Sequence, residues 1–311
     1  MRQFLVFDLG GTFIKYALMN EDCDILSQGK VPSPTSSMEE VLDALKGVAD
    51  LYQGQYEGVA ISMPGRIDTN KGIAYTGGAY RFIQNAPMEE LIRQKLGCNV
   101  TIANDGKCAA KAEAARGALK DVEDGAVIVL GSATGGGIVL NHEVRMGVSG
   151  GSGELSNLVT DFDTIAENGF RHMSFDGIYA GIASATGLLL EYGSRKGFGM
   201  GEVFGGKVSG VSFFEAYDAN EQEAIDSLEQ FGLKCAIGIV TIQCVLDLSR
   251  FAIGGGISVR KEVTDAIRNG IHKLYHSEHT LPFSEPEIVS CEFRNDANLI
   301  GALSFYLSRY Q

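Results

Sequence analysis

The chain has 311 residues, a length that predicts two domains. It carries 26 Lys and Arg against 39 Asp and Glu, a formal net charge of −13, with no run of basic residues. Because nucleic-acid binding needs clustered positive charge, this composition argues against a nucleic-acid-binding protein. Apolar stretches such as 126–130 fall far short of the about 20 residues that cross a bilayer, and the N-terminus has no cleavable signal pattern. We therefore expect a cytoplasmic chain with no membrane partner.

The numbers of glycines and cysteines give further information on the kind of protein and on its compartment. The chain has 40 glycines, about 13% against a usual value of about 7%, without collagen-like periodicity. This excess indicates specific tight turns of the backbone. The six cysteines form no CxxC pair and lie mostly in apolar stretches, so we expect free thiols in a reducing compartment.

The first part of the chain alternates strand and helix patterns. Strands are predicted at 4–9, 14–19, 25–30, 59–63 and 100–103. Helices are predicted at 37–52, 87–96 and 107–119, the first capped by Ser37.

The second part repeats this layout. Strands are predicted at 126–130, 138–140 and 251–253, and helices over most of 160–192 and at 221–248, 258–275 and 298–310. The glycine-rich stretch 194–210 is expected to be a loop, either a lid or a plain surface loop. Alternating strands and helices indicate α/β layering, with two similar halves and a cleft between them.

The strongest single motif is DLGGTFIK, which begins at Asp8 within the first predicted strand and continues into two glycines directly after that strand. Gly10 and Gly11 allow a sharp turn whose N–H groups can face an anion, and Thr12 and Lys15 add a hydroxyl and a positive charge. Asp8 can hold Mg²⁺ through water. The alternative is a plain hairpin turn. The motif is neither a Walker A loop nor a GxGxxG dinucleotide turn.

Two further glycine clusters follow predicted strands. A nucleotide touched by all three clusters explains them together, through close backbone approach to phosphates and an open backbone beside adenosine. The residues expected to bind the nucleotide here are Gly131, Ser132, Gly135 and Gly136, then Gly254, Gly255 and Gly256.

Asp105 lies at the end of a predicted strand, where open α/β sheets bind ligands. A carboxylate at this place could accept a hydroxyl proton during phosphoryl transfer. The alternative is that Asp105 only caps the helix that follows, a role that suits aspartate.

In their order along the chain, these segments resemble the ROK family of sugar kinases, within the actin and hexokinase superfamily. The matching segments are DxGGTxxK at 8–15, PGxxD at 64–68, the pair Asn104 and Asp105, a second phosphate motif at 131–138, GxxGE at 150–154 and an adenosine segment at 254–258. Ala133 stands where glycine is usual. The resemblance covers nearly the whole chain.

The resemblance implies an α/β, two-domain actin/hexokinase-like (ribonuclease H-like) fold with a cleft between the domains. The expected small domain is 1–116 completed by 297–311, and the expected large domain is 117–296, through which a homodimer would form.

The implied activity is ATP-dependent phosphorylation of a hexose-type hydroxyl with Mg²⁺ and Asp105 as base. The sugar would be held by Gly65, Asn104, Glu154 and Asn157. Glucose, a β-glucoside and N-acetylmannosamine all remain open as substrates.

This chain departs from the family pattern in its zinc loop. Many members have a histidine where Asn157 stands and then a cysteine-rich loop, whereas 172–180 contains no cysteine and the family's second sugar-binding glutamate falls on Ala180. Because structural zinc needs four sulfur or nitrogen ligands, we expect none here. His272, His276 and His279 are expected to lie on a solvated helix face without an acidic partner set.

Two other functions compete with a kinase. ROK repressors carry a helix-turn-helix module before the DxGGT strand, and we expect none here because Asp8 is the eighth residue. A sugar-binding regulatory protein without kinase activity is suggested by the replacements at Asn157 and Ala180. The intact Asp105 and phosphate motifs favour the kinase.

Overall fold

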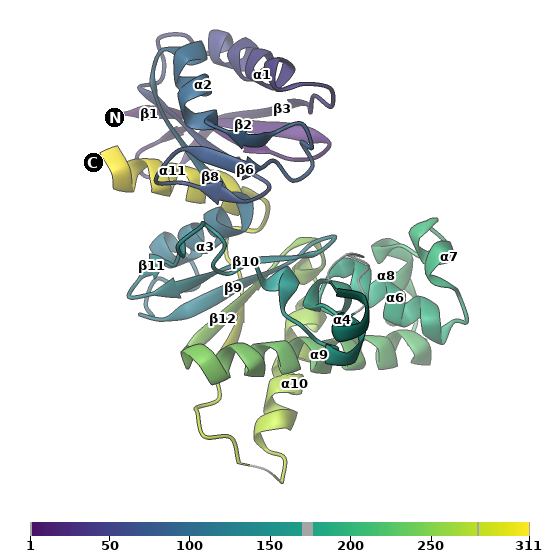
Figure 1. Cartoon of the computed structure of the whole chain (residues 1–311). Coiled ribbons are helices and arrows are strands. Elements are labelled where there is room, and N and C mark those ends of the chain that lie inside the picture. Colours follow the sequence, from purple (N-terminus) through teal and green to yellow (C-terminus); the bar gives the residue numbers. More distant parts are fainter. Residues whose placement is uncertain (1, 170–176, 279, 311) are drawn as a thin grey trace. The chain divides into compact units, whose positions relative to one another are not determined.

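The computed structural model describes residues 2–169, 177–278 and 280–310 (Figure 1). The chain divides into two compact units. Unit 1 comprises Met1–Lys120, Gly137–Gly153 and Asn295–Gln311. Unit 2 comprises Asp121–Gly136 and Glu154–Arg294.

Unit 1 is built on a five-stranded sheet with the order β3-β2-β1-β4-β8. Its strands are β1 (Gln3–Leu9), β2 (Phe13–Asn20), β3 (Ile25–Pro32), β4 (Gly58–Met63) and β8 (Asn99–Asn104). β1, β4 and β8 run parallel, whereas β2 pairs antiparallel with both β1 and β3. The carboxyl ends of β1, β4 and β8 therefore meet at one edge of the sheet.

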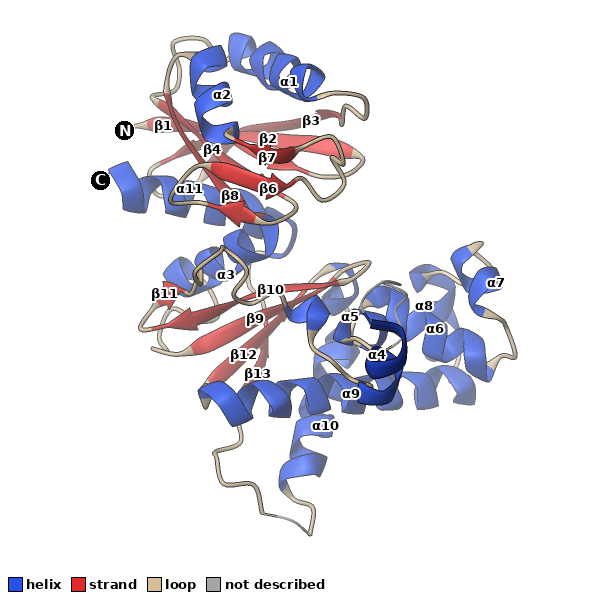
Figure 2. Cartoon of the chain, in the orientation of Figure 1, coloured by secondary structure: helices blue, strands red, loops and turns tan. Residues whose placement is uncertain are grey.

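Helices cover both faces of this sheet (Figure 2). They are α1 (Met38–Leu51), α2 (Met88–Leu96), α3 (Asp105–Arg116) and α11 (Ala297–Tyr310). α1 and α2 lie on one face, and α3 and α11 lie on the other. As predicted, Ser37 caps α1, because its side chain accepts a hydrogen bond from the backbone N–H of Glu40.

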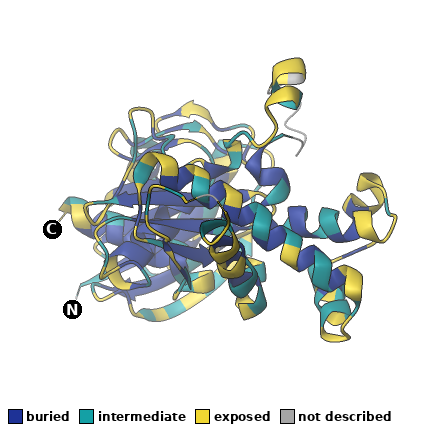
Figure 3. Ribbon diagram, turned by 90° about the horizontal axis from the view of Figure 1, so that it is seen from below, coloured by how far each residue is buried: buried dark blue, intermediate teal, exposed yellow. Residues whose placement is uncertain are grey.

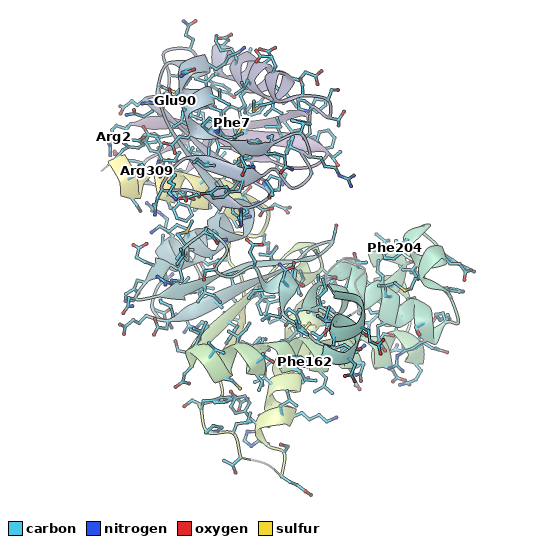
Figure 4. The ribbon with its side chains drawn as sticks, in the orientation of Figure 1. Arg2, Phe7, Glu90, Phe162, Phe204 and Arg309 are labelled. Carbon is cyan, nitrogen blue, oxygen red and sulfur yellow. The ribbon has the colours of Figure 1, made fainter. Side chains whose placement is uncertain are left out.

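β1 reads as an almost continuous apolar run because it is buried on both faces (Figure 3). Phe7 belongs to the core beneath α1 and α2 (Figure 4). Phe4, on the opposite face, packs against Tyr306 of α11 with ring centroids 5.2 Å apart. Arg309, also on α11, forms an ion pair of 2.7 Å with Glu89 at the start of α2.

The second sheet has the order β11-β10-β9-β12-β13. Its strands are β9 (Gly125–Leu130), β10 (Thr134–Leu140), β11 (Glu143–Val144), β12 (Arg250–Gly254) and β13 (Glu287–Ser290). β12 is parallel to both β9 and β13, so the carboxyl ends of these strands also share an edge.

β9, β12, β13 and the first residues of β10 belong to unit 2, and the other regular elements described in that unit are helices. Its α-helices are α4 (Phe162–Asn168), α5 (Tyr179–Ile182), α6 (Ala185–Arg195), α7 (Met200–Phe204), α8 (Gly210–Asp218), α9 (Gln222–Leu246) and α10 (Lys261–Tyr275). Short 3₁₀ turns are η1 (Leu155–Asn157) and η3 (Gly256–Val259), and η4 (Arg294–Asp296) leads to α11.

Within the described ranges, α9 is the one helix long and apolar enough to cross a bilayer by length and composition alone. Half of its most apolar window is buried inside the protein. α9 packs against α10, where a side chain at Gly232 would overlap the Ala266 carbonyl. Much of the apolar character of α9 is thus accounted for by helix packing.

Several local predictions were wrong. The stretch 194–210, expected to be a loop, contains α7, because a glutamate side chain caps the helix by accepting from the Gly199 backbone N–H. The helix expected over most of 160–192 is three shorter helices, and 170–176 lies outside the described residues. The sequence pattern also missed α8, β13 and a small sheet of β5 (Ile67–Asp68), β6 (Ile73–Thr76) and β7 (Gln84–Ala86).

The two units also differ from the expected domains in the segment 137–153, which belongs with unit 1. Gly137 faces α3 closely, since a Cβ there would lie 2.6 Å from that of Ala110. The Lys111 ammonium on α3 also pairs with Glu143 at 2.7 Å. These contacts attach the segment to α3.

The contact between α3 and α11 generates a first prediction. A Cβ at Gly301 would overlap the Cys108 carbonyl, so we expect Gly301→Ala to destabilise the protein by about 1–3 kcal/mol through overpacking. Gly47→Ala in α1 is the matched control, because nothing lies within 4 Å of its Cβ position. That variant should gain up to about 1 kcal/mol from helix propensity. Chemical denaturation of both variants measures the difference, and equal stabilities would contradict the packing argument.

Candidate functional site

The turn between β1 and β2 is a short hairpin, Gly10 to Thr12, tied firmly to its surroundings. The backbone N–H of Gly10 donates to the Phe13 carbonyl at 3.0 Å. The Gly10 carbonyl accepts from the Ser33 hydroxyl at 2.6 Å and the Tyr80 hydroxyl at 2.8 Å. The hairpin interpretation therefore describes the local geometry. Because the Gly10 N–H is used within the turn, an anion here would have to be bound by the N–H groups of Gly11 and Thr12.

Asp8 is a buried carboxylate at the end of β1, with 7% of its surface exposed. Its Oδ1 accepts hydrogen bonds from the Ser62 hydroxyl at 2.9 Å and the Asn298 amide at 3.1 Å. Lys15, its partner in the β1–β2 register, places its Nζ 3.9 Å from Oδ2. One carboxylate oxygen is thus fixed by neutral donors, and the other faces a cation that is half exposed.

Ser62 and Asn298 were missed by the sequence analysis. Ser62 is the partner of Asp8 in the parallel register of β1 and β4, so strand pairing could have suggested it. Asn298 lies in the first turn of α11, 290 positions from Asp8, and no local pattern connects the two.

Asn104 and Asp105 lie where β8 passes into α3, and the structure separates their roles. The cap of α3 is Asn104, whose Oδ1 accepts from the Lys107 backbone N–H at 3.1 Å. The interpretation of Asp105 as the helix cap is therefore wrong. The Asp105 Oδ1 accepts from the Gly106 backbone N–H at 2.8 Å and from the Asn104 side-chain amide at 2.9 Å.

Gly65 is held at φ +100°, and a Cβ there would overlap the Thr76 carbonyl. Its own carbonyl accepts the second N–H of the Asn104 amide at 2.9 Å. Both donors of Asn104 are thus used within the protein, one by Gly65 and one by Asp105. A sugar contact by the Asn104 side chain would have to use its Oδ1.

Asp68, the last residue of the PGxxD segment, supports the turn before β6. Burial raises the pKa of its carboxyl, but the Lys71 backbone N–H and ammonium outweigh burial, and the pKa is lowered overall. The Lys71 N–H lies 3.1 Å from Oδ1, and the ammonium lies 3.2 Å from Oδ2. This aspartate therefore has a structural partner for each oxygen.

In unit 2 the second and third glycine clusters come together. Val129 pairs with Gly254 in the parallel register of β9 and β12, so the turns after both strands lie at one edge. Gly255 has φ +98°, and a Cβ there would overlap the Leu130 carbonyl. Gly256 is exposed, with nothing within 4 Å of its Cβ position. Contact of one nucleotide with all three glycine clusters stays a prediction.

The turn after β9 consists of Gly131, Ser132 and Ala133 and is anchored to the start of α6. The Gly131 carbonyl accepts from the Ala185 backbone N–H at 2.9 Å, and the Ser132 carbonyl accepts from the Thr186 hydroxyl at 2.8 Å. Ser132 itself is exposed.

Gly135 and Gly136 were expected between two strands, but they lie inside β10. Gly136 is buried, and a Cβ there would overlap the Val127 carbonyl on β9. Close strand packing therefore explains this glycine. Nucleotide binding by Gly135 and Gly136 stays a prediction.

Glu154 directly precedes the 3₁₀ turn η1, Asn157 is the last residue of that turn, and both are exposed. The turn is fixed to β10 by the Ser156 hydroxyl, which donates to the Thr134 carbonyl, and by buried Leu155. The backbone N–H of Asn157 donates to the Glu154 carbonyl at 3.2 Å. This short turn thus presents a carboxylate and an amide from a rigid support.

The sequence analysis made predictions about metal ligands in two segments, the region 172–180 and the histidines at the end of α10. The zinc-loop prediction concerned 172–180, of which 172–176 lies outside the described residues, and Ala180 is buried in α5. The expectation that His272 and His276 have no acidic partner is wrong, because Glu285 lies within 3.5 Å of both. His279 is also outside the described residues.

A pocket of about 1060 Å³ lies within unit 2 and contains none of the predicted site residues. Its lining comes from α4, α5, α6, α7 and α9 and includes Phe162 (labelled in Figure 4), Tyr179, Glu191 and Ile237. The lining also includes polar and charged side chains, among them Asp161, Gln230 and Lys234.

The sequence model of the ROK family matches residues 5–309. The chain belongs to the ROK family. Among ROK relatives, an N-acetyl-D-glucosamine kinase of Vibrio atlanticus is 29% identical over 81% of this chain and 83% of its own length. A beta-glucoside kinase of Listeria monocytogenes is 26% identical over 97% of this chain and 96% of its own.

Solved ROK structures confirm the predicted fold class. A ROK family glucokinase from Streptomyces griseus, in complex with glucose and AMPPNP, matches with a TM-score of 0.79 and 25% identity over 97% of this chain and 98% of that one. A ROK family transcriptional regulator matches with a TM-score of 0.82 and 23% identity, over 99% of this chain and 78% of that one. The fold is thus shared by enzymes and regulators within the family.

The hydrogen bonds of Asn104 generate a second prediction. Asn104→Ala removes the cap of α3 and the two bonds donated by the amide, so we expect a loss of about 2 kcal/mol or more in unfolding free energy. Asn104→Ser, which retains a capping oxygen, should lose less. Ser37→Ala removes an exposed cap alone and should cost about 1 kcal/mol. Denaturant titrations compare the three, and equal losses for Asn104→Ala and Ser37→Ala would refute the bridging role.

Proposed function

We propose that this ROK protein transfers the γ-phosphoryl group of ATP to a hydroxyl of a hexose or hexose derivative. The observation that carries the proposal lies within unit 1. Asp8 lies near the end of β1 and Asp105 directly follows β8, and these two strands belong to one parallel set, so both carboxylates lie at the same sheet edge. The Asp8 carboxylate faces the Lys15 ammonium, whereas the Asp105 carboxylate accepts a hydrogen bond from the first turn of α3. These different surroundings suit separate roles in phosphoryl transfer.

Asp105 is the proposed general base. Its Oδ1 is fixed by Gly106 and Asn104, and the carboxylate accepts the proton of the attacking sugar hydroxyl. The sugar oxygen then forms a bond to the γ-phosphorus as the bond to the ADP oxygen breaks. Such catalysis depends mainly on positioning and charge neutralisation.

The phosphates are assigned to the first two glycine turns. Gly11, Thr12 and Lys15 of unit 1 supply backbone N–H groups, a hydroxyl and a cation, while Gly131 and Ser132 supply the exposed turn of unit 2. Gly254 to Gly256 are assigned to the adenosine, because Gly256 offers bare backbone.

Asp8 fits a magnesium ion as a buried carboxylate whose Oδ1 is held by neutral donors, while its Oδ2 lies 3.9 Å from the exposed Lys15 ammonium, beyond hydrogen-bond distance. Mg²⁺, when bound, would neutralise charge on the phosphates. Ser62 and Asn298 keep the carboxylate oriented for a bound water of that ion.

Glu154 and Asn157 are the proposed sugar contacts on η1, with Asn104 Oδ1 and the Gly65 turn as contacts in unit 1. The kinases among its relatives act on N-acetyl-D-glucosamine and on beta-glucosides, as their names state. We extend the proposed substrate class to these sugars, with glucose and N-acetylmannosamine beside them. A homodimer and a cytoplasmic location remain predictions from the sequence.

The test is ADP release from Mg-ATP with a panel of sugars: glucose, mannose, fructose, N-acetylmannosamine, N-acetylglucosamine, cellobiose and simple β-glucosides. We expect sugar-dependent turnover, and a fall of about 10²–10⁴-fold in kcat for Asp105→Asn because the base is lost. Nucleotide binding by that variant should persist. Asp50→Asn, at an exposed site on α1, is the matched control and should keep full activity.

Two results would contradict the proposal. Full activity of Asp105→Asn would remove that residue from its role as base. Sugar binding without turnover for any member of the panel would instead support a sugar-binding regulatory protein, the alternative drawn from the sequence.

The exposed carboxylate of Glu154 gives a separate prediction. Glu154→Gln removes a charged acceptor for sugar hydroxyls, and charge-assisted hydrogen bonds contribute about 1.5–3 kcal/mol. We therefore expect the KM for the sugar to rise at least about tenfold, while the KM for ATP stays unchanged. Steady-state kinetics with each substrate varied in turn measures both. An unchanged KM for the sugar would remove Glu154 from the site.

A further inference from the structure

The end of α10 and the chain that follows bring two imidazoles and a carboxylate together, and none of these three residues is among those assigned to catalysis. His272 Nδ1 lies 3.5 Å from Glu285 Oε1, and His276 Nε2 lies 3.3 Å from Glu285 Oε2. One ligand atom from each of the three residues lies within 4.8 Å of the other two. We propose that His272, His276 and Glu285 form a binding site for a divalent transition-metal ion such as Zn²⁺.

The two histidines have the spacing that a helix needs to present both rings to one ion. They are four residues apart, so they lie on one face of the last turn, and their ring centroids are 4.0 Å apart. In a tetrahedral zinc site with bonds of 2.0–2.1 Å, neighbouring ligand atoms are about 3.4 Å apart. The two nitrogen–oxygen distances to Glu285, 3.5 Å to Oε1 and 3.3 Å to Oε2, are close to this separation but involve different oxygens. Rotation of the exposed side chains would bring one ligand atom of each, already within 4.8 Å of the other two, around a single ion.

The position of Glu285 is supported independently of the histidines. Phe283 packs its ring edge-on against Tyr275 of α10, with centroids 6.1 Å apart. The Gln243 amide on α9 donates to the Ser284 carbonyl at 3.4 Å. The residues just before Glu285 are therefore held against two helices. This arrangement lowers the entropic cost of collecting the three ligands.

The charge around the cluster favours a cation. The site lies at the C-terminal end of α10, where the helix dipole is negative, and the carboxylate of Glu285 adds a negative charge to the cluster. The positive charge of Lys273 in the same turn opposes this negative charge, while the carboxylate of Glu278 just beyond the helix adds to it. Exposed histidine–carboxylate pairs alone contribute little to stability, so stability gives little reason for this three-residue arrangement.

The ligand set also selects the metal. Imidazole nitrogen with carboxylate oxygen suits zinc, nickel and copper, whereas magnesium prefers oxygen ligands and retains its waters. The magnesium that accompanies ATP would not occupy this cluster. The proposal of a metal site can therefore be tested independently of the proposed kinase activity.

The test is zinc binding by the full-length, chelator-treated protein, measured by calorimetry without nucleotide. We expect one site per chain that His272→Ala, His276→Ala and Glu285→Gln each weaken at least about tenfold, because loss of even an outer-shell partner costs about 10–100-fold. His142→Asn is the matched control, an exposed histidine elsewhere whose φ of +62° asparagine tolerates. It should bind zinc as the unaltered protein does.

Cobalt absorption identifies the ligands directly. Tetrahedral Co²⁺ bound by nitrogen and oxygen should show visible bands without thiolate charge-transfer bands, and the three variants should lose them. Unchanged zinc affinity in all three variants would overturn the proposal. So would thiolate bands, which would place the metal on the free cysteines, or the absence of saturable binding below millimolar zinc.

Discussion

The side-chain amide of Asn104 is the contact on which the proposed chemistry of unit 1 depends. Its oxygen caps α3, and its two N–H groups hold the Gly65 carbonyl and the Asp105 carboxylate. A single planar group thus sets the start of a helix, the shape of a turn and the direction of the proposed base. The same helix packs against α11, which supplies Asn298 to Asp8. Both carboxylates are therefore oriented by neutral amides, which add no competing charge beside a phosphate.

Much of this unit could be predicted because its signals are local. The apolar run of β1 reflects burial on both faces, and Ser37 before a periodic apolar pattern marks the start of α1. Asp8 and Asp105 were placed at strand ends from sequence alone, and parallel pairing then puts strand ends at one edge. The sequence also singled out the pair Asn104 and Asp105. Which of the two caps α3 could not be predicted, because asparagine and aspartate are both favoured at helix caps and only the backbone geometry decides between them.

The features that the sequence analysis missed depend mostly on contacts between residues that are far apart in the chain. The bond from Asn298 to Asp8 joins residues 290 positions apart, and Glu285 reaches two histidines of a helix that ends ten residues earlier. Gly136 was expected between two strands, yet it lies inside β10, where the nearby Val127 carbonyl leaves no space for a side chain. The helix α7 arose within a glycine-rich stretch because one glutamate side chain caps it.

The position of α11 at the far end of the chain sets an order of assembly during synthesis. One face of the first sheet is covered by α1 and α2, which leave the ribosome early, but the other is covered only in part by α3 until residues 297–310 are made. Until then Phe4 lacks its aromatic partner Tyr306, and Asp8 lacks the amide of Asn298. The nascent chain must therefore keep part of an apolar sheet face uncovered while all of unit 2 is made. The docking of α11 then completes both the cover of this sheet and the hydrogen bonding of Asp8, the carboxylate proposed to hold Mg²⁺.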